Sequence, residues 1–317
     1  MFLDNLKTIA LQVFILYLMA GVGFVTDKIG LFKQSDGKRL IDLIFNVVLP
    51  IAIINTFIKM EYTPSHVKGL VVAFVCAIAT HIFAALISLF TFKKQNVNLR
   101  GIYHYATVFS NASFLALPLA QSVIGEEGIF YCSVYVAVFN IFAFTYGIYE
   151  ISGRKAKIDL KKLIFNPGSI SVIIGLPLFF LKFKAPYVIE YPLQMISNCN
   201  SPLAMIVFGT FLANSNFKNL IKKKELYFVS FLRLVFIPVC MLLLFKIFNV
   251  NGDLLVAMTI SAAAPTATNT AMYAAKYDND AALGSELAAQ SSVLSVISMP
   301  VSWHSHPLYS FLVCLNC

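Results

Sequence analysis

Charged residues are scarce in this chain. Asp, Glu, Lys and Arg together make up 12% of its 317 residues, whereas soluble domains carry roughly 25%. Hydrophobic residues reach 59%, and the mean hydropathy is +0.78. Too few charges are left to cover a soluble domain of useful size, so the composition predicts a polytopic membrane protein. The net charge of +9 does not indicate nucleic-acid binding, because the basic residues lie in short loops between apolar segments.

Motifs of catalysis are also missing. The sequence has no His-Glu-x-x-His, no Gly-x-Ser-x-Gly and no Gly-x-x-x-x-Gly-Lys phosphate loop. We therefore expect neither an enzyme nor an ATP-driven pump, and no bound cofactor or metal. The six cysteines do not imply a disulfide framework. Four of them fall in apolar segments and are expected to be small buried thiols: Cys76, Cys132, Cys199 and Cys240.

What the chain does have is long apolar segments. A membrane span needs about 20 mostly apolar residues. Ten segments qualify: 8–25, 39–58, 67–92, 101–124, 128–149, 163–181, 192–213, 226–248, 254–275 and 281–302. The first lacks a charged leader and a cleavage site, so we expect it to stay as a span. Loops that join odd to even spans carry 17 Lys and Arg, against 6 on the other side. This asymmetry predicts that both termini lie outside.

The two halves of the chain resemble each other. When the sequence is shifted by 152 residues, spans 1–5 fall on spans 6–10 without a gap. Asn46 and Pro50 then align with Asn198 and Pro202, as candidate helix breaks in a scaffold. Five spans per copy is an odd number, so the second copy must be inserted upside down. We predict inverted repeats at 1–150 and 151–302, followed by an atypical tail at 303–317.

Polar residues and prolines interrupt spans 4 and 9 at similar places, residues 110–118 and 264–270. A membrane helix tolerates broken backbone only where protein or trapped water satisfies it, and paired breaks in two halves point to a transport site. Half-helix N-termini attract anions. A pair of proline kinks without a ligand is the alternative. The candidate substrate-binding residues are Asn111, Ser113, Pro118, Pro265, Thr266, Thr268 and Asn269.

Three ionisable residues have candidate charge roles. Arg233, in span 8, either holds a substrate carboxylate or, as we favour, snorkels toward the Lys-rich cytoplasmic loop; pairing with a neighbouring carboxylate is a further alternative. His81 aligns with Arg233 in the repeat and is either a hydrogen-bonded packing residue or part of a proton relay. Glu286, early in span 10, either completes an acidic cytoplasmic turn or has a charge role in transport.

The tail after Pro300 differs in composition from the rest of the chain. It contains His304 and His306, and it ends on Cys314 and Cys317, a spacing that zinc sites also use. We do not expect a metal there, because the segment lies outside the repeat and lacks supporting polar groups.

Taken together, these segments resemble the auxin efflux carrier family, which includes bacterial malate permease-like members. The similarity covers about residues 5–302. It rests on the stretches 110–118, 125–128, 201–204, 233–238, 264–267, 273–276 and 291–295. Many relatives have Gly-Asn-x-Gly where this chain has Ser110 to Ser113. The resemblance implies ten spans in two inverted repeats, with spans 4 and 9 broken and crossing. It also implies a scaffold of spans 1, 2, 6 and 7, a mobile transport domain made of the others, and organic-anion substrates.

We therefore predict an all-α membrane protein of ten transmembrane helices that acts as a secondary transporter. It would move a small mono- or dicarboxylate, similar to auxin or malate, across a plasma membrane (the bacterial inner membrane) by alternating access. The expected partners are the organic anion and membrane lipids, with a coupling proton or sodium ion and a second copy of the chain as further candidates. Nucleic acid is not expected. An anion channel, or a receptor derived from a transporter fold, is the alternative.

Overall fold

The computed structural model describes residues 2–156, 165–214 and 223–304. Every regular element in these ranges is helical, apart from one isolated β-bridge. The first half contains α1 (Phe2–Lys28), α2 (Gln34–Leu43), η1 (Ile44–Val48), α3 (Leu49–Lys59), α4 (Pro64–Phe90), α5 (Val97–Val108), η2 (Ala112–Ala116), α6 (Leu117–Ile124), α7 (Glu126–Phe142), η3 (Ala143–Gly147) and α8 (Ile148–Ile151). The second half contains α10 (Pro167–Phe180), α11 (Tyr187–Asn198), α12 (Asn200–Ala213), α14 (Lys224–Phe231), η4 (Leu232–Phe236), α15 (Ile237–Ile247), α16 (Gly252–Ala263), α17 (Asn269–Lys276) and α18 (Ala281–His304).

The expectation of an all-helical membrane protein is confirmed. Among the described residues, five continuous helical stretches are long and apolar enough to cross a membrane: Arg39–Lys59, Pro64–Phe90, Glu126–Ile151, Tyr187–Ala213 and Lys224–Ile247. Shorter apolar helices occur at Ala112–Ile124, Pro167–Phe180 and Gly252–Ala263. The segments expected as spans 4 and 9 are each divided into two helices. Most of the tail at 303–317 lies outside the described residues.

Prolines explain three of the four π-helical turns. The residues that close these wide turns are Leu49, Leu117 and Ile237, which donate their N–H groups to the carbonyls of Ile44, Ala112 and Leu232. Each closing residue comes directly before a proline: Pro50, Pro118 or Pro238. Proline has no N–H and clashes with the carbonyl four residues earlier. One widened turn removes that clash while the helix continues, so these prolines bend spans without ending them.

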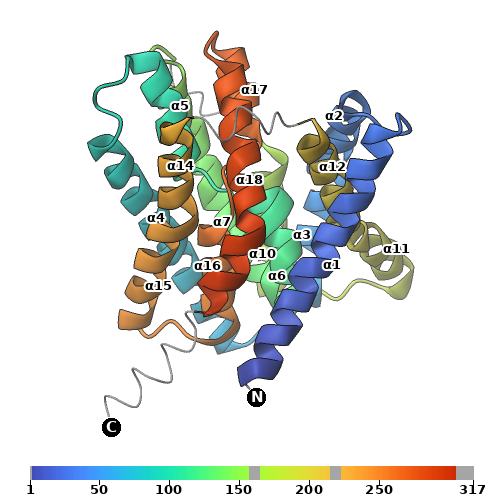
Figure 1. Cartoon of the computed structure of the whole chain (residues 1–317). Helices are drawn as coiled ribbons and strands as arrows, with labels where there is room; N and C mark the ends of the chain where they lie inside the picture. The colour runs from blue at the N-terminus through green and yellow to red at the C-terminus, as the bar shows by residue number, and fades with distance from the viewer. Residues whose placement is uncertain (1, 157–164, 215–222, 305–317) are drawn as a thin grey trace.

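Glycines allow two helices from different halves of the chain to touch through their backbones. A methyl group on Gly23 of α1 would lie 1.9 Å from the carbonyl oxygen of Ile206 on α12. A methyl group on Gly209 of α12 would lie equally close to the carbonyl of Ala20. Close backbone approach at small residues is the usual way in which membrane helices gain packing energy. The helices α1 and α12 therefore form one tightly packed pair, which stands at one side of the molecule (Figure 1).

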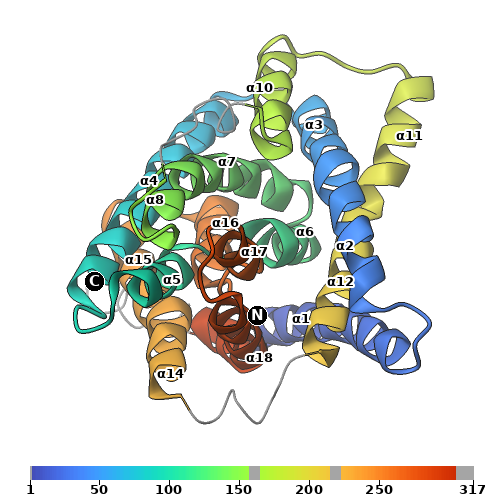
Figure 2. The same ribbon diagram turned by 90° about the horizontal axis from the view of Figure 1, so that it is seen from above.

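A second pair repeats this arrangement. The helix α10 packs along α3, where Gly175 faces the ring of Phe57. Seen from above, α1, α3, α10, α11 and α12 line the outside of the molecule on two sides (Figure 2). The helices α16, α17, α6 and α18 lie nearer its centre, and α4, α5, α14 and α15 lie on the far side. Of the divided helices, α6, α16 and α17 thus lie among the other helices, whereas α5 lies toward the far side.

The cysteines differ in part from expectation. Cys76 and Cys132 are buried free thiols, as expected, and Cys240 is half-buried. Cys199 is exposed, because it forms the turn between α11 and α12. The expectation that it is a buried thiol was wrong, since an apolar segment does not reveal which of its sides faces lipid.

Candidate functional site

The two divided helices meet at their breaks. α5 ends at Val108 and η2 begins at Ala112, whereas α16 ends at Ala263 and α17 begins at Asn269. The extended residues between them pair as an antiparallel bridge of Ser110 with Thr266. The N–H of Asn111 donates to the carbonyl of Pro265 at 2.7 Å, and the N–H of Ala267 donates to that of Phe109 at 2.9 Å. Each break therefore satisfies backbone groups of the other, as non-helical backbone inside a membrane protein requires.

Asn111 forms a tight turn at the first break. Its φ of −76° and ψ of 59° are those of an inverse γ-turn, in which the N–H of Ala112 donates to the carbonyl of Ser110 at 2.8 Å. The carbonyl of Asn111 accepts the N–H groups of Leu115 and Ala116. The main chain of Asn111 thus starts the next helix, and its side chain is not needed for this.

Thr266 anchors the second break to its neighbours. Its hydroxyl donates to the carbonyl of Ala106 at 2.9 Å, and its N–H donates to the hydroxyl of Ser291 on α18 at 3.1 Å. Thr266 is fully buried. We conclude that Thr266 holds the crossing together and is not placed to contact a ligand directly.

Arg233 caps both helices that end at the crossing. Its Nε donates to the carbonyl of Ala264 at 3.0 Å, and Nη2 contacts the carbonyl of Ala262. Nη1 reaches the carbonyls of Thr107 and Val108 at 3.4 and 3.2 Å. These four carbonyls belong to the last turn of α5 and to the last turn and C-cap of α16, where a helix leaves acceptors without partners.

The charge of Arg233 matches what it caps. A helix C-terminus is equivalent to roughly −0.5 of an elementary charge, and an N-terminus to roughly +0.5. Two C-termini therefore amount to about one negative charge, which one guanidinium neutralises. The helices that begin at the crossing, η2 with α6 and α17, keep their positive N-termini. The crossing is left with an excess of positive potential although only one charged side chain contributes.

The expectation that Arg233 snorkels to the cytoplasmic loop was wrong. The residue is 0% exposed and all three nitrogens of its guanidinium group face backbone carbonyls. An arginine side chain can bond carbonyls in several directions because its donors form a rigid fork. The sequence did not reveal this, because the four acceptors come from segments more than a hundred residues apart.

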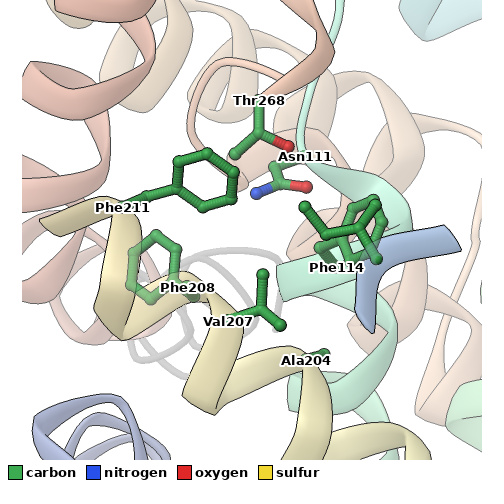
Figure 3. Close-up of a pocket in the computed structure, with 8 residues that line it drawn as sticks. Asn111, Phe114, Ala204, Val207, Phe208, Phe211 and Thr268 are labelled. Atoms are coloured by element: carbon green, nitrogen blue, oxygen red, sulfur yellow. The ribbon is translucent and has the colours of Figure 1, made fainter. Parts of the chain in front are cut away.

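A pocket opens beside the crossing. None of the eight residues that line it is charged (Figure 3). Asn111 and Thr268 lie at its polar end, and rings from α12 and η2 face them. The lining residues are Ile41, Asn111, Phe114, Ala204, Val207, Phe208, Phe211 and Thr268.

The amide nitrogen of Asn111 has no hydrogen-bond partner among the residues that the structure describes. It is buried, in a side chain that is only 3% exposed, and it belongs to a residue that lines the pocket. Leaving a buried donor unpaired costs about 1–3 kcal/mol. A ligand oxygen in the pocket would supply the missing acceptor.

The other candidate residues have varied positions. Ser113 is half-buried in η2, and Pro118 is buried in α6. Pro265 contributes its carbonyl to Asn111. Asn269 begins α17, and its side-chain oxygen accepts the hydroxyl of Tyr105 at 3.3 Å. Of the seven candidates, only Asn111 and Thr268 line the pocket.

The four scaffold candidates are not among the residues that line the pocket. Asn46 is in η1 and bonds the carbonyl of Asp42 at 2.7 Å, and Pro50 follows in α3. Asn198 ends α11, and Pro202 lies in the first turn of α12.

His81 and Glu286 also have local partners. His81 is fully buried; its Nδ1 bonds the carbonyl of Ala77 at 2.8 Å and its ring stacks on Phe142. Glu286 accepts Lys223 at 2.5 Å, which ties the start of α14 to α18.

Sequence reasoning missed two groups of residues. The first is the apolar wall that Phe208, Phe211 and Val207 supply from α12, which no local pattern separates from lipid-facing residues. The second is a buried contact between His104 and Glu150. The sequence did contain an indication of this pair, because both residues are ionisable and lie inside or at the end of an apolar segment.

Comparison with known proteins agrees with this geometry. The family model described as "Membrane transport protein" matches residues 8–303. The chain belongs to this membrane transport family. The resemblance to the auxin efflux carriers is thereby confirmed, and so is the expectation that the protein is a transporter and not an enzyme. As a member of the family, the protein is a multi-pass membrane protein with a substrate to carry.

Two archaeal relatives cover nearly the whole of this membrane transport protein. An uncharacterized transporter of Methanocaldococcus jannaschii is 25% identical over 278 residues, which is 84% of this chain and 89% of the relative. An uncharacterized transporter of Methanothermobacter thermautotrophicus is 23% identical over 304 residues, which is 95% of this chain and 98% of the relative. The similarity is thus distant but spans the full length of the fold.

Proposed function

We propose that this protein is a secondary transporter of a small organic anion, which binds at the crossing of the two divided helices. The observation that carries the proposal is the charge balance there. Arg233 neutralises the two helix C-termini, and the two N-termini, with the unpaired amide of Asn111, remain for a ligand. Two N-termini supply about one positive charge, which suits one carboxylate. Thr268 adds a hydroxyl at the same end of the pocket.

We propose further that residues 1–150 and 151–302 are inverted repeats of five spans each. This is supported by matched packing: α1 packs on α12 and α10 on α3, which are equivalent pairs once the halves are exchanged. The paired residues Ser110 and Thr266 are 156 apart instead of 152. This offset of four residues is about one helical turn. The site would then be pseudo-symmetric, with different contacts on its two sides.

Alternating access would follow from movement between two bundles. The spans expected as scaffold contain α1, α3, α10, α11 and α12, and the pocket lies between α12 and the crossing. Few polar contacts join the scaffold to the remaining helices. Examples are Tyr17 with Ser295 at 2.9 Å and Ser201 with Gln121 at 2.9 Å. A substrate bound at such a boundary can be exposed to either side when one bundle moves against the other.

An anion channel or a receptor derived from this fold is the rival function. Purified protein would be screened by thermal unfolding against mono- and dicarboxylates, because a ligand of the folded state at 100 times its dissociation constant adds about 2.7 kcal/mol to stability. Proteoliposomes loaded with unlabelled malate would then be tested for uptake of radiolabelled malate. We expect saturable uptake that internal malate stimulates. Uptake without saturation or stimulation would indicate a channel, and stabilisation without any uptake would indicate a receptor.

The orientation is also a proposal. The excess of basic residues in loops between odd and even spans places those loops in the cytoplasm and both termini outside. With the native cysteines replaced, a cysteine at Glu126 should react with an impermeant thiol reagent in intact cells. A cysteine at Lys155 should react only after the membrane is opened. The reverse pattern would overturn the proposed orientation.

A further inference from the structure

His104 and Glu150 form a buried hydrogen-bonded pair away from the pocket. Nδ1 of His104 lies 2.9 Å from Oε2 of Glu150, and the two side chains are 1% and 3% exposed. His104 is on α5 and Glu150 on α8, which pack against each other. A methyl group on Gly101 would lie 2.0 Å from the carbonyl oxygen of Glu150. The backbone contact at Gly101, one turn before His104, brings the carboxylate up to the imidazole.

The other atoms of this pair are arranged asymmetrically. Oε1 of Glu150 accepts the guanidinium of Arg154 at 3.0 and 3.1 Å. Arg154 is 38% exposed, so it connects the carboxylate to solvent. Nε2 of His104 is buried and has no hydrogen-bond partner within the described parts of the chain. A purely structural link would need only Nδ1. Nε2 leaves a place where a proton can be added or removed without breaking the bond to Glu150.

The charges around His104 leave room for one more proton. When the imidazole of His104 is neutral, the negative charge of Glu150 and the positive charge of Arg154 cancel. Among the described residues, only Glu150 bonds or ion-pairs with the His104 ring. The other ionisable side chains on elements packed around α5 and its neighbours include His81 on α4, Tyr146 on η3, Glu225 on α14, Arg233 on η4, Tyr273 on α17, Asp280 just before α18 and Glu286 on α18.

The pair is connected to the proposed anion site by short contacts. The next residue, Tyr105, donates its hydroxyl to Asn269 at the start of α17. Three residues after the end of α17, the amide nitrogen of Asn279 donates to the carbonyl of Asn98 in the first turn of α5 and to that of Ile151 at the end of α8, at 3.0 and 2.9 Å. α17 is therefore held at both ends by the two helices that carry His104 and Glu150.

We propose that His104 and Glu150 form an internal proton-binding site that couples proton movement to anion transport. Histidine is the side chain whose charge changes most readily near neutral pH, and buried ionisable residues in membrane proteins mark proton relays. A proton on His104 adds a positive charge on the same half-helix that leads to Asn111. It therefore favours the bound anion, and by linkage the anion favours the proton. The binding of a dicarboxylate gains most from this proton, because a dicarboxylate has one negative charge more than the two helix N-termini balance. The coupling rests on the proposed transport function, whereas the proton site does not.

The first experiment needs no substrate. Full-length protein in lipid nanodiscs, labelled with ¹³C and ¹⁵N at its five histidines, would be followed by NMR between pH 5 and 8. The His104 signal is identified by its loss in His104→Asn, a variant whose amide nitrogen takes the place of Nδ1 and keeps the bond to Glu150. We expect the His104 signal to shift reversibly with pH. A signal that does not move across this range would show that the pair is only structural and would overturn the proposal.

The second experiment tests coupling in proteoliposomes with the membrane potential clamped at zero. An acidic exterior should drive accumulation of radiolabelled malate by wild-type protein, about tenfold per pH unit for each proton carried. His104→Asn and Glu150→Gln should lose this accumulation and keep malate exchange at equal pH. The control is His66→Asn, which alters a His–Glu pair of the same 2.9 Å distance at a half-exposed position, and it should accumulate malate as wild type does.

Two outcomes separate this inference from the proposed function. Accumulation by His104→Asn at the wild-type level would overturn the coupling while the transporter stands. If wild-type protein shows no malate exchange at equal pH, the proposed transport of malate fails, and the NMR titration alone decides whether His104 is a proton site.

Discussion

Replacement of Arg233 by lysine is expected to destabilise the protein by about 3–5 kcal/mol, the range for breaking a buried charge interaction. The guanidinium contacts four carbonyls on two helices. Lysine has three donors on a single nitrogen and cannot reach acceptors that lie in different directions. Each buried carbonyl left without a partner costs about 1–3 kcal/mol. The loss should be seen as a lower temperature at which a thiol-reactive dye reaches the buried Cys76 and Cys132.

Arg233→Leu should destabilise the protein more than Arg233→Lys does. It would remove the charge that offsets two helix C-termini, each equivalent to roughly −0.5 of an elementary charge, and the crossing would then lose the excess positive potential that attracts an anion. The matched control is Arg39→Lys, because Arg39 is exposed at the start of its helical stretch. It should unfold at the wild-type temperature. If Arg233→Lys were as stable as Arg39→Lys and still transported substrate, the carbonyl contacts would have no importance for the fold.

Asn111→Ala is expected to separate transport from stability. The side-chain amide nitrogen has no partner in the absence of ligand, and alanine can adopt the inverse γ-turn that Asn111 forms. The variant should therefore fold as well as wild type or better. Loss of a hydrogen bond to a charged ligand costs about 1.5–3 kcal/mol, which corresponds to a roughly 10–100-fold weaker affinity. Labelled malate exchange measured over a range of concentrations would report this affinity.

Two further variants serve as comparisons for Asn111→Ala. Asn269→Ala should also weaken exchange, but it removes the acceptor for Tyr105 and should lower the unfolding temperature as well. Asn198→Ala changes an exposed amide at the end of α11 and should leave both measurements unchanged. Wild-type affinity in Asn111→Ala would move the binding site away from the crossing. An unfolding temperature well below that of wild type would instead give the side chain a structural role.

The positive potential at the crossing depends on which helix ends Arg233 contacts. The four half-helices bring two C-termini and two N-termini to one place, and the charges of an unmodified crossing would cancel. One arginine that binds only the C-termini breaks this balance. Its placement also keeps the guanidinium outside the pocket lining. A ligand anion would thus be held by backbone dipoles and amides, which need not move or change protonation when the protein changes state.

The sequence by itself determined the class of this protein and the location of its breaks. Apolar segments of the right length, few charges and paired polar interruptions predict helices in a membrane, because lipid leaves no other partner for backbone groups. The prolines at 50, 118 and 238 also indicate local distortions of their helices, because the missing N–H disturbs the hydrogen bonding of the adjacent turn. These effects are local along the chain, and so a single sequence contains them in full.

Only the tertiary structure decided which residues serve the site. Arg233 was expected at the surface and instead caps α5 and α16, because its acceptors at Thr107, Val108, Ala262 and Ala264 meet only when the halves cross. The apolar wall from α12 and the contact of His104 with Glu150 likewise join distant segments. Apolar patterning states that a residue avoids water but not whether it faces lipid or protein. That choice is made by packing, and it is what separates the site from the rest of the membrane surface.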